Sequence, residues 1–291
     1  MPFSDVVGQK EAIAALKAMV RRSRGSGSTL IVGPEGVGRF LLACATARVV
    51  LAPDGGAAAS RVASGQHADL ILLDSETGID GVRAVIESTA LRPVEAERQV
   101  LILRDADRLS VEAQNALLKT LEEPPGGACV LVVAQGPEFL PETVVSRCRI
   151  VRARALTKPE TKQVLTRIGV DPALADDAEG SPGRAEYLSV QGIPEAAKEM
   201  ERLILRRCED PLGASEKLVR RRSEEKSKDQ RRRLIETLRV VANRLRARLP
   251  DSEGDLRSVL EGLGSLARNA NPAMVFADLA LLRWKSPPTP S

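Results

Sequence analysis

Four short, apolar runs alternate with helical patterns over the first 155 residues, and this alternation limits the fold more than any other feature of the chain. The runs are Leu30–Val32, Leu70–Leu73, Val100–Leu103 and Val130–Val133. Continuous apolar runs of this length are typical of strands that are covered on both faces. Helical periodicity surrounds them, over residues 7–23, 40–50, 79–90 and 110–122. The pattern predicts an α/β domain with a parallel sheet between two layers of helices.

A glycine-rich loop follows the first predicted strand. Its glycines are Gly33, Gly36 and Gly38, and the next helix begins after them. Strand, glycine loop and helix in this order are typical of a phosphate loop, in which a lysine contacts the phosphates and a Ser or Thr hydroxyl binds magnesium. Here those two positions hold Arg39, whose planar head is wider than an ammonium, and Phe40, which has no oxygen. The plainer alternative is a loop that only turns a strand into a helix.

The segment after Val100–Leu103 is the second part of the predicted nucleotide site. A working site places two acidic residues there, one for magnesium and one for the attacking water. In one register Arg104 takes the metal position and Asp105 the catalytic position; in the other, Asp105 takes the metal position and Ala106 the catalytic one. Either register leaves one acidic role empty. We therefore expect binding of ATP and magnesium to be lost or weak.

Two longer motifs identify a family. Residues 105–125 read Asp-Ala-Asp-Arg-Leu-Ser-Val-Glu-Ala-Gln-Asn-Ala-Leu-Leu-Lys-Thr-Leu-Glu-Glu-Pro-Pro, and Ser146-Arg-Cys148 follows. Together they resemble the central signature of AAA+ clamp-loader subunits of bacterial DNA polymerase III, and Phe3–Gln9 resembles the family's opening motif near the adenine pocket. The resemblance is specific up to about residue 190 and architectural beyond it. It is strongest to the delta-prime type, whose nucleotide site is often degenerate.

This resemblance implies three domains and a tail. We expect an AAA+ P-loop NTPase-like α/β domain over residues 1–155, a small helical lid over 156–192, an all-α collar for oligomerisation over 193–285, and a loose tail over 286–291. Thr157 is suited to cap the first lid helix and Pro159 to occupy its first turn. One collar helix has its apolar residues on a single stripe: Leu234, Leu238, Val241, Leu245 and Leu249.

The resemblance also implies roles for single residues. Arg147, with Ser146 and Cys148, corresponds to an arginine finger that reaches the ATP of a neighbouring subunit. Gln135 lies at the first sensor position, and Arg184, within Gly180–Ala185, at the second. The alternative for Arg147 is an ordinary surface ion pair. A degenerate site together with a retained finger predicts a non-hydrolysing stator subunit that completes another subunit's active site.

Cysteine and histidine positions argue against a metal. Many related subunits carry a four-cysteine zinc module after the first phosphate-loop helix, but the corresponding segment, Leu51–Gly65, has no cysteine. We expect a metal-free loop there and no zinc. The lone histidine, His67, is interpreted as a packing residue. Reduced, buried thiols are expected for the four cysteines, which are far apart in sequence: Cys44, Cys129, Cys148 and Cys208.

The remaining composition bears on partners and location. Arginines are frequent between Arg202 and Arg248, but acidic residues alternate with them and the net charge is only +4. Such mixing is typical of a solvated helix face. The sequence shows no secretory signal and no apolar run long enough to span a membrane, so we expect a cytoplasmic protein. The expected partners are gamma/tau-type and delta-type subunits in a pentameric ring, with primed DNA and the sliding clamp bound through the complex. An ATP-hydrolysing gamma/tau-type subunit and a DNA-binding adaptor are the alternatives.

Overall fold

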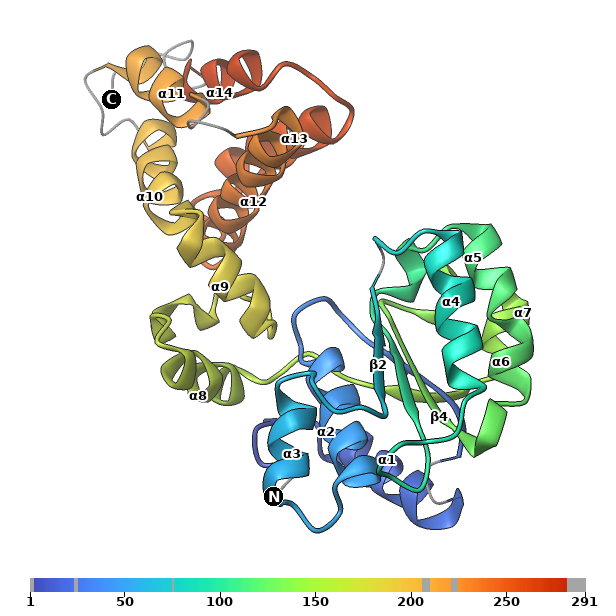
Figure 1. Cartoon of the computed structure of the whole chain (residues 1–291). Coiled ribbons are helices and arrows are strands. Elements are labelled where there is room, and N and C mark those ends of the chain that lie inside the picture. Colours follow the sequence, from blue (N-terminus) through green and yellow to red (C-terminus); the bar gives the residue numbers. More distant parts are fainter. Residues whose placement is uncertain (1–2, 24–25, 75, 206–209, 221–224, 282–291) are drawn as a thin grey trace, which may run out of the picture. The chain divides into compact units, whose positions relative to one another are not determined.

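The computed structural model describes residues 3–23, 26–74, 76–205, 210–220 and 225–281, which form two units (Figure 1). Unit 1 comprises Met1–Val164 and Ala178–Arg184, and unit 2 comprises Leu165–Asp177 and Ala185–Ser291. Cys208 and the predicted tail lie outside the described residues. The predicted division into α/β, lid and collar domains stays a proposal.

Unit 1 is built on a five-stranded parallel sheet. Its strand order is β2-β3-β4-β1-β5, so the glycine loop leaves a strand near the sheet's centre. The four predicted strands are confirmed, and the α/β fold class with them. The predicted burial is wrong for β2, which lies at the edge of the sheet and leaves Leu72 47% exposed. The fifth strand was not predicted; it pairs with β1, with Thr29 opposite Arg149. The strands are β1 (Gly27–Val32), β2 (Leu70–Leu73), β3 (Val100–Leu103), β4 (Cys129–Ala134) and β5 (Arg149–Arg152).

Helices cover both faces of this sheet (Figure 1). Alternate residues of β3 pack against opposite layers of helices. Val100 and Ile102 belong to one hydrophobic core, and Leu101 and Leu103 belong to the other. All four are fully buried, as a central parallel strand requires. One layer contains α1 (Lys10–Ser23), α2 (Arg39–Leu51) and α3 (Gly56–Ala63). The other contains α4 (Ile79–Thr89), α5 (Val111–Ala116), α6 (Leu118–Glu122) and α7 (Glu142–Val145).

One local prediction is wrong, and a second is correct except for a break at one residue. The expected loop over Leu51–Gly65 contains α3, because its run of alanines has the highest helix propensity and because Ala59 and Val62 are buried. The single helix expected over residues 110–122 is divided into α5 and α6 at Leu117, whose amide bonds the carbonyl of Gln114, only three residues back.

Unit 2 is helical, and its core is centred on side chains such as Met200, Leu238 and Phe276. The predicted stripe is buried at its first four positions, but Leu249 is 47% exposed because α12 ends at Arg246. Helices α8 and α9 each cross from one unit to the other. The elements of this region are α8 (Lys158–Ile168), α9 (Pro182–Val190), α10 (Ile193–Ile204), α11 (Pro211–Val219), α12 (Ser227–Arg246), α13 (Glu253–Ala267) and α14 (Pro272–Leu281).

A buried carboxylate fixes the loop that leads into β3. Asp69 accepts hydrogen bonds from the backbone amides of Val94, Glu95 and Ala96, at 2.6, 2.9 and 2.8 Å. His67 is also buried; its Nδ1 accepts the amide of Asp69 at 3.1 Å, and its Nε2 lies 3.4 Å from the Glu95 carboxylate. The interpretation of His67 as a packing residue is confirmed.

Candidate functional site

The glycine loop connects β1 to α2 and depends on backbone conformations that glycine favours. Gly33, Gly36 and Gly38 all have positive φ angles, of 154°, 77° and 97°. A Cβ atom on Gly33 would lie 2.3 Å from the carbonyl oxygen of Ala153, and one on Gly36 would lie 2.3 Å from Oγ of Ser181. The loop therefore requires glycine both for its conformation and for close packing.

Much of the loop's backbone is hydrogen-bonded within unit 1. The amide of Gly33 donates to the Gln135 carbonyl at 3.1 Å. Oγ of Ser181 donates to the Glu35 carbonyl at 2.7 Å, and the amide of Gly183 donates to the Gly36 carbonyl at 3.1 Å. Residues 178–184, which include all but the last residue of the predicted second-sensor segment Gly180–Ala185, thus hold the glycine loop directly.

Arg39, in place of the expected lysine, is buried at the start of α2. Burial lowers the pKa of its guanidinium, while the nearby carboxylates of Asp105, Asp107 and Glu35 oppose that shift. Its Nη1 atom is buried with no hydrogen-bond partner among the described residues. Arginine remains charged under these conditions, so the chain places its own cation among the site's acidic groups.

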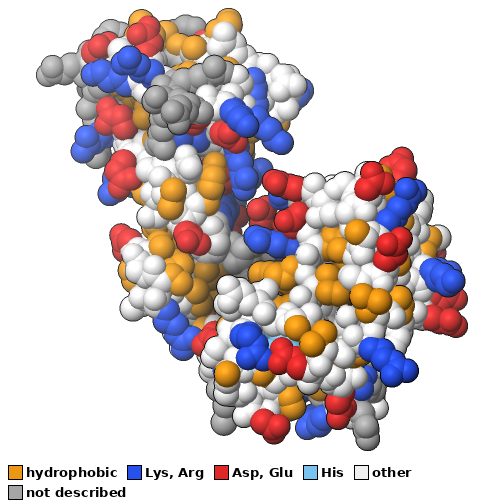
Figure 2. All heavy atoms as spheres, viewed as in Figure 1, with side chains coloured by type: hydrophobic (Ala, Val, Ile, Leu, Met, Phe, Trp, Pro, Cys, Tyr) orange, Lys and Arg blue, Asp and Glu red, His pale blue; other side chains and the backbone are white. Residues whose placement is uncertain are grey.

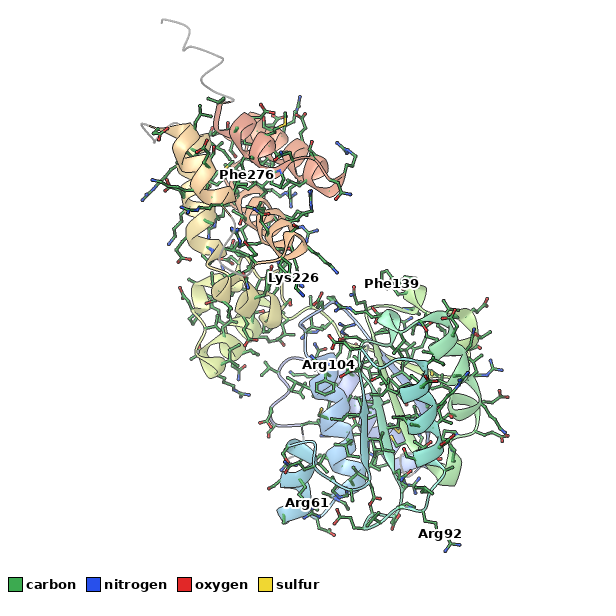
Figure 3. The ribbon with its side chains drawn as sticks, turned by 45° about the horizontal axis from the view of Figure 1, so that its top comes forward. Arg61, Arg92, Arg104, Phe139, Lys226 and Phe276 are labelled. Carbon is green, nitrogen blue, oxygen red and sulfur yellow. The ribbon has the colours of Figure 1, made fainter. Side chains whose placement is uncertain are left out.

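Phe40 and Arg104, the two residues that replace expected magnesium ligands, contact each other. The guanidinium of Arg104, labelled in Figure 3, lies over the Phe40 ring at 4.9 Å from its centroid, which is a cation–π arrangement. Nε of Arg104 also lies 3.8 Å from Oδ2 of Asp105. A ring and a guanidinium therefore occupy the positions that should supply magnesium ligands. These residues do not fit a magnesium-bound nucleotide.

Asp105 and Asp107, the acidic residues after β3, lie close to Arg39. Asp105 has a left-handed backbone, with φ 49° and ψ 49°, which is uncommon for a residue other than glycine. Asp107 accepts the Gln135 amide through Oδ1 at 3.3 Å. Gln135 thus contributes backbone groups to the glycine loop and to Asp107. Arg184, the predicted second-sensor arginine, pairs with Glu179.

Residue 147 lies on the other helical layer, two residues after the end of α7. Arg147 donates from Nε to the Glu122 carboxylate at 2.9 Å and from Nη1 to the Thr143 carbonyl at 3.0 Å. Ser146 bonds the same carbonyl through Oγ at 3.3 Å. Cys148 packs against the adjacent core, and burial raises the pKa of its thiol to about 11, so it remains protonated.

The other described thiols behave similarly. Burial raises the pKa of Cys44 to about 11 and that of Cys129 to about 12, and the cysteines in this part of the chain are free. No cluster of three or more His, Cys, Asp or Glu side chains that could hold a metal ion occurs among the described residues. Within the same residues, no helix has the length and apolar character needed to cross a membrane.

The arginines of α12 are used largely within unit 2. Arg231 donates to the Leu266 and Ala270 carbonyls, Arg232 lies over the Tyr187 ring, and Arg233 is buried in an ion pair with Glu225. The expectation of a solvated face is therefore wrong for Arg233. Acidic and basic side chains are interspersed over the face seen in Figure 2. Arg221 and Arg222, which belong to the same arginine-rich stretch between Arg202 and Arg248, lie outside the described residues.

The sequence interpretation overlooked a polar side chain that ties the opening motif to the site. Gln9 is buried and donates from Nε2 to the carbonyls of Val37 and Arg154, at 3.2 and 2.8 Å. Its Oε1 accepts the Arg154 amide at 3.0 Å. One side chain thus joins the glycine loop to the segment after β5. Gln9 is the last residue of the opening motif Phe3–Gln9, but nothing in that motif indicates these partners.

A second polar cluster fixes the beginning of α8. Glu160 binds the Arg154 guanidinium through both oxygens, at 2.9 and 2.8 Å, and accepts the Thr157 amide at 2.8 Å. These bonds, with Arg154 making the largest contribution, lower the pKa of Glu160 to about 2. Thr157 is thus bonded through its backbone amide, as in one half of a capping box.

Comparisons with known proteins place the chain in a family. A family model described as "DNA polymerase III, delta subunit" matches residues 8–157, a little more than half of the chain. The chain is 32% identical over 198 residues to DNA polymerase III subunit tau/gamma of Haemophilus influenzae, covering 62% of this chain and 29% of that protein. It is 28% identical over 213 residues to subunit delta' of Pseudomonas aeruginosa, covering 67% and 65%.

A solved structure supports the fold. A DNA polymerase III gamma subunit-related protein of Thermotoga maritima aligns with a TM-score of 0.52 and 18% identity, covering 94% of this chain and 99% of that one. The chain spans only about a third of the length of the tau relatives it matches. The resemblance to AAA+ clamp-loader subunits is confirmed: the chain belongs to the DNA polymerase III delta subunit family.

Proposed function

We propose that this chain is a delta-prime-type stator of the DNA polymerase III clamp loader. It helps to load the sliding clamp onto primed DNA during replication and does not itself hydrolyse ATP. In a pentameric ring with gamma/tau-type and delta-type subunits, Arg147 reaches the ATP held by a neighbouring subunit. The observation that carries this proposal is the contact between Phe40 and Arg104, which places a ring and a guanidinium where magnesium ligands are expected.

The contact explains why ATP chemistry would fail here. Phosphoryl transfer depends on magnesium to neutralise charge on the phosphates, and the metal needs oxygen ligands from the protein. Phe40 supplies no oxygen, and Arg104 adds a positive charge 4.9 Å from the ring centroid. A divalent cation would be repelled by Arg104 and would lack its usual ligand at residue 40.

Local electrostatics also disfavour a bound triphosphate. Three arginines, Arg39, Arg104 and Arg108, lie near three carboxylates. These are Asp105, Asp107 and Glu35, so the three positive and three negative formal charges cancel. A site for a polyanion needs excess positive charge or free amide donors. Here the carboxylates already compensate the arginines, and one of the loop's amides, that of Gly33, already donates to the Gln135 carbonyl.

The proposed arginine finger depends on Arg147 and not on the residues of the chain's own site. The side chain of Arg147 is 32% exposed, and its Nη2 atom makes no hydrogen bond with any residue that the structure describes. It therefore has N–H groups available for a phosphate on another subunit. Arginine fingers stabilise the charge that develops on the transferred phosphoryl group and are worth about 10³ to 10⁵ in rate.

Two experiments test the proposal. The first is calorimetric titration of the purified chain with Mg-ATP, paired with a phosphate-release assay; we expect neither binding nor turnover. The second compares Arg147→Ala with Arg149→Ala in a complex reconstituted with the gamma/tau-type and delta-type subunits. We expect a large loss of ATPase rate only for Arg147→Ala. An unchanged rate in that variant would exclude the finger assignment.

A gamma/tau-type ATPase is the second candidate, and sequence identity favours it. The tau/gamma relative of Haemophilus influenzae is 32% identical to this chain, against 28% for the delta' relative of Pseudomonas aeruginosa. This candidate predicts Mg-dependent ATP turnover by the isolated chain. Turnover that disappears in Gly36→Ala but persists in Gly78→Ala, a glycine with open space around it, would establish it in place of the stator.

A further inference from the structure

The geometry points to Glu122 as a positioning residue that aims Arg147 toward a phosphate held by another subunit. This inference rests on the proposed finger role of Arg147 and adds a second residue to it. Glu122 lies 25 residues before Arg147 in the sequence, and its carboxylate accepts the Nε hydrogen at 2.9 Å. Glu122 belongs to the motif over residues 105–125, but nothing in the sequence pairs it with Arg147.

Glu122 is itself held in place by the sheet. It is the last residue of α6, and the preceding Leu121 is buried in the core of that layer. The Leu121 carbonyl accepts a hydrogen bond from Oγ of Ser28, on β1, at 2.7 Å. The carboxylate therefore extends from a backbone that is anchored by both packing and a hydrogen bond.

The guanidinium is held from the side that faces its own subunit. A guanidinium has five N–H donors: one on Nε and two on each terminal nitrogen. Glu122 accepts the Nε donor, and the Thr143 carbonyl accepts one Nη1 donor at 3.0 Å. One donor on Nη1 and both on Nη2 have no partner among the described residues. The terminal edge that binds a phosphate in a bidentate manner is therefore left open.

Two fixed contacts determine the direction of that edge. A free arginine side chain samples many rotamers, whereas bonds to Nε and to Nη1 fix both the position and the rotation of the planar head. Glu122 makes its contact while 60% exposed, so its side chain contributes little to the core. This separates a role in aiming Arg147 from a role in folding.

The test uses the complete complex, reconstituted with the gamma/tau-type and delta-type subunits, and measures ATPase kcat and KM. The variants are Glu122→Leu, Glu122→Gln, Arg147→Ala and the double variant Glu122→Leu with Arg147→Ala. Glu123→Leu is the matched control, because Glu123 is adjacent and exposed and its side chain makes no polar contact with the described residues. Circular dichroism and complex assembly verify that each variant folds.

We expect Glu122→Leu to lower kcat by about 10- to 100-fold with little change in KM, since misplacing a catalytic group by about 1 Å can cost about 10². Glu122→Gln keeps an oxygen acceptor for Nε and should retain most of the rate. The double variant should be no slower than Arg147→Ala alone, because Glu122 acts only through Arg147. Glu123→Leu should match the wild type.

Other results would overturn the inference. If Arg147→Ala lowers the rate but Glu122→Leu does not, the finger stands and Glu122 has no positioning role. A faster Glu122→Leu complex would identify Glu122 as a restraint on the finger instead of an aid. Losses that multiply in the double variant would show that Glu122 acts independently of Arg147. If Arg147→Ala has no effect, the proposed finger and this inference fail together.

Discussion

Replacing Asp69 by Asn should destabilise unit 1 strongly, although the two side chains have nearly the same shape. Asp69 is fully buried, and its carboxylate accepts three backbone amides. Oδ1 accepts the Val94 amide, and Oδ2 accepts those of Glu95 and Ala96. An asparagine has one oxygen and one amino group, so its amino group must face at least one amide donor in either orientation.

The magnitude follows from these three bonds. In the better orientation, the Asn oxygen replaces Oδ2, and two bonds change from charge-assisted to neutral at a cost of about 1 kcal/mol each. The Val94 amide then loses its acceptor, and a buried donor without a partner costs about 1 to 3 kcal/mol. We expect the free energy of unfolding to fall by about 3 to 5 kcal/mol at pH 7.

The pKa of Asp69 determines how the stability difference between wild type and Asp69→Asn changes with pH. Burial alone would raise the pKa of Asp69, but the three amide bonds and the nearby His67 outweigh it and hold the pKa below its ordinary value. The stabilisation is therefore complete above the unfolded-state pKa of about 3.9 and is lost as the pH falls through the lower folded-state value. The difference between wild type and Asp69→Asn should be constant from neutral to mildly acidic pH and should shrink below about pH 4.

Urea denaturation between pH 7 and pH 2.5 measures this difference, and amide hydrogen exchange at residues 94–96 locates it. Asp74→Asn is the control, because Asp74 is exposed and caps a turn at the surface; it should change stability by less than about 0.5 kcal/mol. A loss below about 1 kcal/mol in Asp69→Asn, or amides that keep their full protection, would refute the assignment of three charge-assisted bonds.

Three further predictions concern the site and its supports. A double-mutant cycle of Phe40→Leu and Arg104→Leu, measured by urea denaturation, should give a coupling energy of about 0.5 to 1 kcal/mol; zero coupling would mean that the ring and guanidinium do not interact in solution. Glu160→Gln should cost about 1 to 2 kcal/mol at pH 6, and because the pKa of Glu160 is lowered to about 2, this difference should disappear between about pH 4.5 and pH 2; a difference that persists at pH 2 would contradict this. Gly33→Ala should destabilise the chain by more than about 2 kcal/mol because its Cβ would lie 2.3 Å from a carbonyl oxygen, whereas Gly78→Ala, with open space around it, should not; equal stability of the two variants in thermal unfolding would contradict the close packing.

The sequence predicted the central strands well because their burial leaves a simple signal. Val100–Leu103 is a continuous, fully buried apolar run with polar boundaries, and the structure has β3 over the same residues. The sequence contains no such signal for β5, where charged residues flank only two apolar ones. That strand exists because β1 offers it a free edge, which is a tertiary effect.

The candidate site was predicted residue by residue but not as a set of contacts. Phe40 and Arg104 each stood out as a departure from a family motif, yet the sequence could not show that they contact each other across 64 positions. Glu122 lies within the family motif over residues 105–125, but a glutamate at a helix end is ordinary and nothing there pairs it with Arg147. Long-range pairs depend on the fold and are therefore invisible to local patterns.

The path of the chain between the two units has a consequence for dissecting the protein. The second unit includes Leu165–Asp177, so it cannot be recovered by cutting the chain once at Ala185. In the intact chain Arg244 bonds both Asp177, at 2.9 Å, and Glu201, at 3.4 Å. A fragment that begins at Ala185 would keep Arg244 and Glu201 but lose Asp177. Arg244 would then lack the shorter of its two hydrogen bonds. A low stability of this fragment would therefore result from the position of the cut and would not measure the stability of these helices in the whole protein.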